Sequence, residues 1–471
     1  MYIRQLTILF SLLFPASVFG QGSIRQGPPA QLYTQHCAVC HGDDYRGGAG
    51  GSLLVDEWEI IEQSDEALAH FIREGKKEKD LVAFGDAMTD REIRSLVVYL
   101  NEVRSDAVTR VEQTPLRERV ELEAGDVRFV LEPVVTGALE IPWALAFDSG
   151  GRGLVTERPG RLRWLVDGEL SDPIRGIPDS LHLGQGGMMD VAFHPDYDEN
   201  GWVYLVFTEG IEGGRGLTSV ARGRIDGLEW KDEELIYRAD DEHFTGGRVH
   251  FGSRVVFRDG YLWFAIGDRG MQNLAQDKST PQGNIHRLHD DGRVPSDNPF
   301  VDHAEDALPT IWSWGHRNPQ GLAFHPETGE LWSAEHGPRG GDEVNLIEKG
   351  GNYGGPVVTH GINYNGTPIT EHISKPGMVD PVRQWTPSIS ICAIAFYTGG
   401  DFPGWKNDLF VTGLRSEELW RLKTRDGGVA EEEIVLKGFG RIRDVTMGQD
   451  GLLYLVLNSP DSIVRLRPFD E

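Results

Sequence analysis

The stretch from Gly315 to Gly354, GHRNPQGLAFHPETGELWSAEHGPRGGDEVNLIEKGGNYG, predicts a strand hairpin flanked by two glycine-rich polar loops. In either loop alone, Gly, Asn and Asp are explained well enough as turn formers. Two such loops beside one hairpin, carrying guanidinium, imidazole and carboxylate groups together, indicate a site built on a rigid scaffold. The side chains in these loops that are capable of chemistry are Arg317, Asn318, His336, Arg339, Asp342 and Glu343.

A second reactive group lies near the N-terminus, in the motif Cys37-Ala38-Val39-Cys40-His41. This spacing lets two thiols form thioethers to a porphyrin while His41 presents its imidazole to the iron, which is the c-type haem attachment signature. A redox CxxC pair and half of a zinc site are the alternatives. The chain has only 3 cysteines, and neither a second Cys pair nor a βαβ pattern supports those alternatives. The motif therefore predicts haem c.

The residues around this motif are typical of helices. Residues 30–36 predict a helix that leads into the motif, and residues 90–102 have apolar side chains at helical spacing after a cap at Thr89 or Asp90. The pair resembles the terminal helices of small cytochromes c. Met88 lies just before the second helix, where that family places its axial thioether. Core packing is the commoner role of methionine, but the position favours iron ligation, and a His/Met pair raises the potential enough to accept electrons from a quinol.

The chain divides into four segments. Residues 1–20 have the layout of a signal peptide, with Arg4 before an apolar run that is too short to favour a membrane span, so we expect cleavage after Gly20. The mature protein is then exported, to the periplasm in a Gram-negative organism. We expect a cytochrome c domain over residues 21–103, a charged linker over residues 104–127, and one large domain over residues 128–471.

The large domain contains six copies of one unit, in which two short apolar runs are separated by a Gly/Asp/Pro turn. The copies recur at spacings of roughly 45 to 70 residues, which suits one four-stranded blade per copy. A pair of β-sandwiches does not predict such self-similarity. The sequence therefore predicts an all-β six-bladed propeller preceded by a small all-α domain. The key residues of the six copies are Phe147, Phe193, Phe257, Phe324, Phe396 and Met447.

Polar residues recur just before the first run of a copy or just after its second run, positions that converge on one end of a propeller channel. The chain as a whole carries a net charge of −27, which argues against nucleic acid or an anionic membrane as partner. Several arginines at these positions in so acidic a chain favour a multiply anionic ligand, because arginine binds carboxylates bidentately. The residues at these positions are Gln185, His250, Asp268, Arg317, His336, Arg415, Arg441 and Arg443.

From Phe129 to the C-terminus, the segments GHRNPQGLAF, EHGPRGGDEVNLI and KGGNYG resemble the soluble quinoprotein sugar dehydrogenases. These enzymes use pyrroloquinoline quinone (PQQ), a tricarboxylate, and calcium on a six-bladed β-propeller. The resemblance implies an aldose dehydrogenase that oxidises the anomeric carbon to a lactone and passes hydride to PQQ. Electrons would continue to the fused haem and then to an external acceptor, such as a soluble cytochrome or a respiratory chain component.

The resemblance also assigns roles to residues. His250 in HFGSR matches the catalytic base, Asp268 the acid that orients it, and Arg317 the arginine that polarises the quinone carbonyl. Imidazole suits the base because its ordinary pKa lies near 6.5. The remaining matches contact the cofactor or its metal. For PQQ or the base they are Gln185, Asn318, His336, Arg415, Arg441 and Arg443; for calcium they are the backbone carbonyls of Gly337 and Pro338, with Glu343 and Tyr353 near a second calcium.

Some positions depart from the family pattern. His336 replaces a glutamine of the glucose-oxidising member, Asn273 replaces another, and the loop around Trp385 differs in composition, so the particular sugar is left open. Arg415 stands where the family usually has lysine, which keeps the charge but not the geometry. Cys392, in an apolar strand, is expected to be a buried, inert thiol. The alternative function is a calcium-dependent carbohydrate-binding or lactonase propeller, which leaves the haem unexplained.

Overall fold

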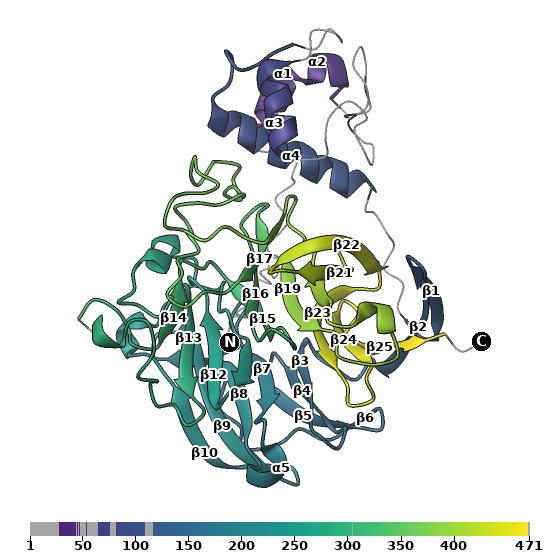
Figure 1. Cartoon of the computed structure of the whole chain (residues 1–471), viewed down its shortest axis with the longest axis vertical. Coiled ribbons are helices and arrows are strands. Elements are labelled where there is room, and N and C mark those ends of the chain that lie inside the picture. Colours follow the sequence, from purple (N-terminus) through teal and green to yellow (C-terminus); the bar gives the residue numbers. More distant parts are fainter. Residues whose placement is uncertain are drawn as a thin grey trace, which may run out of the picture.

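The computed structural model describes residues 28–43, 45, 47, 53, 65–75, 82–108, 116–303 and 305–469. Four helices, grouped to one side of six β-sheets, form the N-terminal part (Figure 1). The expected signal peptide at residues 1–20 lies outside the described residues. Among the described helices, none is both long enough and apolar enough to cross a bilayer. The four N-terminal helices are α1 (Pro28–His36), α2 (Ala38–His41), α3 (Asp65–Glu74) and α4 (Asp90–Val108).

Helix α4 begins with a capping box. The Thr89 side chain accepts from the Glu92 amide at 3.3 Å, and the Glu92 carboxylate accepts from the Thr89 amide at 2.8 Å, so two otherwise unpaired donors are satisfied. Helix α4 continues to Val108, beyond the end that the sequence predicts at residue 102. Its apolar face packs with α1 and α3 around a core that includes Tyr33, Leu96 and Met88.

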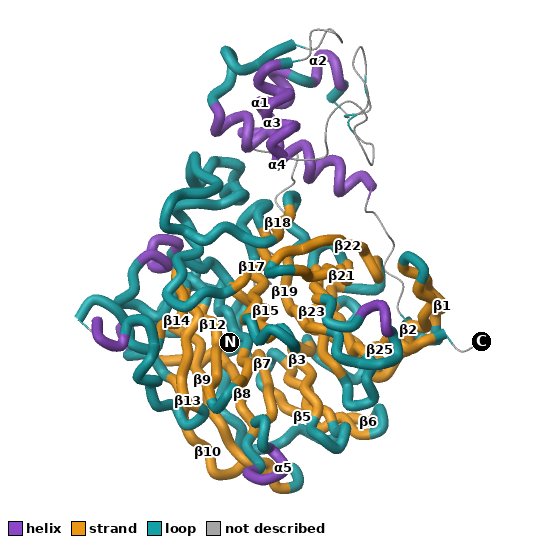
Figure 2. Tube along the Cα trace, in the orientation of Figure 1, coloured by secondary structure: helices purple, strands orange, loops and turns teal. Residues whose placement is uncertain are grey.

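Every further element belongs to the large domain, where strands dominate (Figure 2). The first three sheets are β3–β6 (Pro142–Phe147, Gly153–Glu157, Arg161–Val166, Glu169–Leu170), β7–β10 (Met188–Phe193, Val203–Ile211, Arg215–Asp226, Glu229–Tyr237) and β11–β14 (Val255–Arg258, Tyr261–Ile266, Asn284–His289, Ile311–Trp314). The next two are β15–β18 (Pro319–Phe324, Leu331–Glu335, Asp342–Leu346, Arg383–Trp385) and β19–β22 (Ile391–Phe396, Leu409–Gly413, Glu418–Arg425, Gly428–Lys437). The sixth contains β1 (Val120–Ala124), β2 (Val127–Thr136), β23 (Arg441–Met447), β24 (Leu453–Asn458) and β25 (Ser462–Pro468).

The six sheets are the blades of a closed propeller, as the repeats predict. The innermost strands contact one another in the cyclic order β3, β7, β11, β15, β19, β23 and back to β3. The ring is closed by pairing β2 with β25, which joins the N-terminal end of the domain to its C-terminal strands. Each key residue of a repeat is the last or next-to-last residue of an innermost strand. Short helical turns in the connections are α5 (Tyr197–Asn200), η2 (Asp241–His243), η3 (Gln272–Gln276), η4 (Val301–His303) and η5 (Pro403–Trp405).

The linker expected over residues 104–127 is shorter in the structure. Its first residues continue α4, and its last residues form β1, which pairs with β2 at the outer edge of the sixth blade. Strand β1 reads VELEA, an alternation of apolar and acidic residues that suits an edge strand with one face toward solvent. The charged composition of residues 104–127 therefore does not indicate that this stretch contains a strand.

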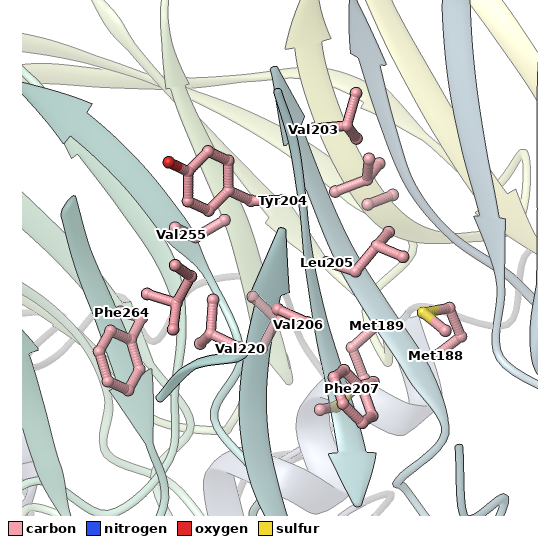
Figure 3. Packing of buried hydrophobic residues seen from close by; sticks show 14 of the residues in the cluster. Met188, Met189, Val203, Tyr204, Leu205, Val206, Phe207, Val220, Val255 and Phe264 are labelled. Carbon is pink, nitrogen blue, oxygen red and sulfur yellow. The ribbon is translucent and has the colours of Figure 1, made fainter. Parts of the chain in front are cut away.

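The cores lie between neighbouring blades. In the cluster between the second and third blades, Val206 and Val220 of the second blade lie toward Val255 and Phe264 of the third (Figure 3). Packing of this kind fixes the strand ends against one another, because a well-packed interior does not deform continuously. The ends of the inner strands are therefore a rigid platform for loops.

Candidate functional site

The polar residues singled out by the repeats do collect at one end of the propeller. In each blade the first two strands are antiparallel, so the start of the first lies beside the end of the second, as Pro319 lies beside Glu335 and Arg441 beside Asn458. A cavity with about 460 Å³ of empty space, part of it open to solvent, lies at this end. Of the predicted site residues, its wall includes Asp268, Arg317, His336, Gly337, Pro338, Glu343 and Tyr353.

His250 and Asp268 form a hydrogen-bonded pair at the cavity. The distance between His250 Nδ1 and Asp268 Oδ1 is 2.6 Å, and the same carboxylate oxygen accepts from the Gly270 amide at 2.7 Å. Donation from Nδ1 leaves Nε2 as the nitrogen with the lone pair. Burial, and next the positive charge of Arg317, lower the pKa of His250 below its ordinary value. A neutral imidazole with a defined tautomer is the form required of a general base.

The backbone around His250 is tightly held. His250 has a φ of 54°, in the left-handed region that residues other than glycine rarely adopt. Its amide donates to the Gln185 side chain at 2.8 Å, and the amide of Gly252 donates to the Asn318 side chain at 3.0 Å. Arg269 is buried over Phe251 and donates to the carbonyls of residues 247 and 249. Strained backbone persists where neighbours enforce it, which is common at functional sites.

Arg317 connects the base to the second polar loop. Its amide donates to the Glu335 carboxylate at 2.9 Å, and its guanidinium donates to the His336 carbonyl at 2.8 Å. The pKa of His336 lies well below its ordinary value because of burial and then the positive charge of Arg317, so this imidazole is neutral. Nε2 of His336 lies 3.1 Å from the Gln320 side-chain oxygen, which accepts from Arg443 at 3.0 Å.

Gln320 is a site residue that the sequence reasoning missed, although the repeats contained the signal. Gln320, Cys392 and Arg443 each stand four residues before the key residue of their copy, and the three side chains meet across adjacent blades. Cys392 is fully buried and lies 3.3 Å from the Gln320 oxygen and 3.4 Å from the Arg443 guanidinium. Its thiol is buried as expected, but its neighbours include polar as well as apolar side chains.

Arg158 is a second residue that was missed. It directly follows β4, the position that His336 occupies after β16. Burial, and then the neighbouring charges of Arg443 and Arg441, lower the pKa of Arg158 to about 10. Among the described residues, no acceptor lies within hydrogen-bond reach of Nε of Arg158 or Nε of Arg317. Clustered guanidinium groups with buried donors left over fit an anionic ligand with several carboxylates.

The residues assigned to calcium lie on the same cavity. Gly337 and Pro338 are part of its wall, and their loop is fixed by buried Asp342, which accepts from the Gly337 amide at 2.9 Å and the Ile391 amide at 3.0 Å. Burial raises the pKa of Asp342 to about 6. Backbone oxygens held this way suit a hard cation. The carboxylate of Asp342 therefore serves to hold the loop through these hydrogen bonds.

The expected second calcium position is only partly provided with ligands. Glu335 and Glu343 share the Asn345 amide, with distances of 3.4 and 3.3 Å, and burial followed by repulsion from Glu335 raises the pKa of Glu343 well above its ordinary value. The Tyr353 hydroxyl donates to the Leu346 carbonyl and accepts from the Glu348 amide. Within the described ranges, no group of three or more His, Cys, Asp or Glu side chains is suited to a metal. A cation here would therefore need backbone or solvent oxygens as well.

Arg415 differs from the other arginines, because a carboxylate from the helical part lies near it. Its Nη1 lies 3.7 Å from Oε1 of Glu102 in α4. Gln185 accepts from the His250 amide, Asn318 accepts from the Gly252 amide two residues further on, and Arg441 and Arg443 are neighbours. The structure thus brings together the residues that the sequence singled out, with Arg415 at the boundary of the two parts of the chain.

The haem motif lies at the junction of α1 and α2 in the helical part. Cys37 and Cys40 are free thiols: Cys37 directly precedes α2, Cys40 lies within it, and His41 ends it. Burial raises the pKa of the Cys37 thiol to about 11. Met88 is 4% exposed and belongs to the core that α1 and α4 share, directly before the capping box of α4. Residues 44, 46 and 48–52, which follow the motif, lie outside the described residues.

Comparison with known proteins identifies both parts of the chain. Residues 139–465 match the family model of the glucose / sorbosone dehydrogenases, and residues 25–100 match that of subunit III of cbb3-type cytochrome c oxidase. The chain is 39% identical over 344 residues to the aldose sugar dehydrogenase YliI of Escherichia coli, a match that covers 71% of this chain and 92% of the relative.

Solved structures agree with this relationship. The apo-form of the soluble aldose sugar dehydrogenase from Escherichia coli superposes with a TM-score of 0.69 at 37% identity, covering 72% of this chain and 99% of that one. The PQQ-bound form of the aldose sugar dehydrogenase from Streptomyces coelicolor superposes with a TM-score of 0.59 at 27% identity, covering 75% of this chain and 99% of that one.

Proposed function

Because the chain belongs to the glucose/sorbosone dehydrogenase family and carries a cytochrome c domain at its N-terminus, we propose that it is a PQQ-dependent aldose dehydrogenase that reduces its own haem. It oxidises the anomeric carbon of an aldose to a lactone. We propose the periplasm as the site of this reaction, because residues 1–20 have the layout of a signal peptide. The observation that carries the proposal is the His250–Asp268 pair, 2.6 Å apart, with Asp268 and Arg317 both on the wall of the cavity.

The residues present fit the implied cofactor. Arg158, Arg441 and Arg443 form a cluster whose buried charge favours bound carboxylates, and Arg415 stands on the boundary with the haem domain. Gly337 and Pro338 would hold calcium through backbone carbonyls on the cavity wall. When bound, PQQ supplies the quinone that accepts hydride from the sugar. The relative from Streptomyces coelicolor, with PQQ bound, supports this choice.

The protein's own residues then accept the proton and stabilise the charge that results. His250 accepts the proton of the anomeric hydroxyl at Nε2, because its Nδ1 proton is held by Asp268. Asp268 stabilises the imidazolium that forms, and its second contact with the Gly270 amide keeps the ring in place. Arg317, fixed by Glu335 and the His336 carbonyl, places positive charge where negative charge develops. Each oxidation removes two electrons and two protons from the sugar, and an external acceptor re-oxidises the haem twice.

The alternative, a calcium-dependent lactonase or carbohydrate-binding propeller, has less support. It leaves the arginine cluster without an anionic ligand and the CxxCH motif without a partner reaction. A lactonase also has no electrons to pass on.

Stopped-flow mixing of the full-length protein, loaded with PQQ and calcium, with an aldose tests the proposal. Haem reduction should occur at a rate that does not change with protein concentration, because the two centres belong to one chain. His250→Gln should slow it by about 10² to 10⁴ while the haem spectrum stays the same. A rate that rises in proportion to protein concentration would mean transfer between molecules, and a wild-type protein that oxidises no aldose would contradict the enzymatic assignment.

A further inference from the structure

A buried carboxylate of the helical part contacts the propeller. Glu102, in α4, is 1% exposed. Its Oε2 accepts from Arg339 Nε at 2.6 Å and lies 2.5 Å from Arg339 Nη2, while its Oε1 lies 3.7 Å from Arg415 Nη1. These two charge-assisted contacts converge on one carboxylate oxygen, Oε2, and together they restrict the orientation of the guanidinium. A buried charge that loses its partners is unfavourable, so this contact specifies one docked arrangement.

A second set of contacts from α4 reaches the loop between β17 and β18. The Arg94 guanidinium donates to the carbonyls of Thr370 and Glu371, both at 3.2 Å. At the rim, Arg91 Nε lies 3.1 Å from a Glu371 carboxylate oxygen, and these two side chains are 50% and 63% exposed. We call the contacts of Arg91, Arg94 and Glu102 with the propeller the α4 interface.

The α4 interface lies directly behind the candidate site. Arg339 pairs through its backbone with Ile362 in both directions at 3.0 Å, so the Gly337–Gly341 loop and the 356–362 segment form one layer. Pro338 and Gly341 from the loop, and Pro356, Val358 and Thr359 from the segment, line the cavity. The outer surface of this layer is bound by α4. This single layer of chain therefore lies between α4 and the cavity.

We propose that Glu102 is a positioning residue for electron transfer from the cavity to the haem. Through Arg339 and Arg415 it holds α4 against the wall of the site, which fixes the distance and orientation of the haem domain. This inference rests on the proposed function, since it requires an electron donor in the cavity. Arg415, which the family resemblance assigns to the cofactor, then serves the contact between the two domains as well.

The test compares Glu102→Lys with Arg91→Gln in the full-length holoprotein. Glu102→Lys places a cation against two arginines, whereas Arg91→Gln removes an exposed pair of the same interface, which typically contributes little. Loss of charge-assisted bonds of this type corresponds to roughly ten- to a hundredfold in the docking equilibrium. We expect haem reduction by aldose to slow at least about tenfold in Glu102→Lys, in line with that shift in the docked population. In Arg91→Gln it should remain as in the wild type.

Two further readouts separate positioning from general damage. Sugar oxidation with a small artificial acceptor, the haem spectrum and the haem potential should remain as in the wild type in Glu102→Lys. Small-angle X-ray scattering should show a larger maximum dimension, because the haem domain is released. If Glu102→Lys loses its haem spectrum, Glu102→Gln replaces it, with a smaller effect in the same direction.

The possible failures are distinguishable. A scattering profile unchanged by both Glu102 variants, or haem reduction at the wild-type rate by a released domain, would overturn the role of Glu102. A wild-type protein that reduces neither dye nor haem with any aldose contradicts the proposed function instead. The scattering comparison still tests the interface in that case, because it needs no substrate.

Discussion

Replacing Asp268 by Asn tests whether His250 is a base held in one tautomer. The carboxylate of Asp268 accepts from His250 Nδ1 at 2.6 Å and from the Gly270 amide at 2.7 Å. Asparagine has the same shape and keeps one carbonyl oxygen at this position. The substitution therefore removes the charge while leaving the packing of a residue that is 1% exposed largely intact.

The magnitude follows from the bond that changes. A hydrogen bond to a charged partner contributes about 1.5–3 kcal/mol, and each 1.4 kcal/mol corresponds to a factor of ten in rate, so kcat should fall roughly 10- to 100-fold. Removing the base itself costs more, about 10² to 10⁴. Asp268→Asn should thus be less impaired than His250→Gln.

The pH profile gives a second, independent signature. Burial and Arg317 lower the pKa of His250, whereas the bond to Asp268 and its negative charge raise it. In the wild type, the acid limb of kcat/KM should therefore lie below pH 6.5. Without the carboxylate the pKa falls further, and because the deprotonated imidazole is the active form, the limb of Asp268→Asn should move to lower pH.

The assay is initial-rate sugar oxidation with an artificial acceptor from about pH 4.5 to 8.5, a range centred on the ordinary histidine pKa. Asp277→Asn is a matched control, because Asp277 lies in the same connection but is exposed, and its carboxylate accepts from Ser279 rather than from a site residue. It should leave both the plateau and the limb unchanged. A lower plateau with an unmoved acid limb would indicate structural damage, and a wild-type plateau would refute the role of Asp268.

Three other predictions concern the bound groups. Met88→Ala should abolish the ferric charge-transfer band near the red edge of the visible spectrum and lower the haem potential, because a thioether ligand favours the reduced iron; an unchanged spectrum would exclude Met88 as a ligand. Complete removal of calcium by a strong chelator should abolish activity, and calcium should restore it; persistent activity in the metal-free protein would remove calcium from the mechanism. Arg158→Leu should weaken PQQ binding roughly tenfold or more in a fluorescence titration, because a largely buried cation of the arginine cluster is lost. Arg175→Leu removes an exposed arginine and should leave PQQ binding unchanged.

The sequence predicted the propeller well because its repeat reflects packing. Phe147, Phe193, Phe324 and Phe396 end the inner strands of their blades, so the same apolar residue recurs wherever neighbouring blades meet. The site residues were predicted for the same reason, since strand ends at one edge converge whatever the loops contain. Arg158 also follows an inner hairpin and was overlooked, although the repeat unit PWALAFDSGGRGLVTER ends with this residue.

Other features depend on contacts that the local pattern does not encode. The charged composition around Glu121 and Glu123 predicts a linker, but all five residues of β1 pair with β2, and the side chains of Val120 and Leu122 pack against the core. In the sequence, Glu102 is one of several acids in an amphipathic helix, and its burial has no local signal. Its partner Arg339 is 237 residues away, and no periodicity links the two. Such pairs are defined by how two domains meet.

Arg415 is a residue at which both the sequence pattern and the contact between the two domains are informative. The resemblance gives lysine at this position, and the match to the Escherichia coli structure covers 99% of that chain but 72% of this one, so the haem domain lies outside what the two share. A lysine ammonium is a point charge that serves one anion best, whereas a planar guanidinium can present separate N–H groups to two carboxylates. Nη1 of Arg415 already lies 3.7 Å from Glu102. The departure from the family pattern at 415 thus occurs where this chain has a second anionic partner to accommodate, the carboxylate by which its haem domain is held.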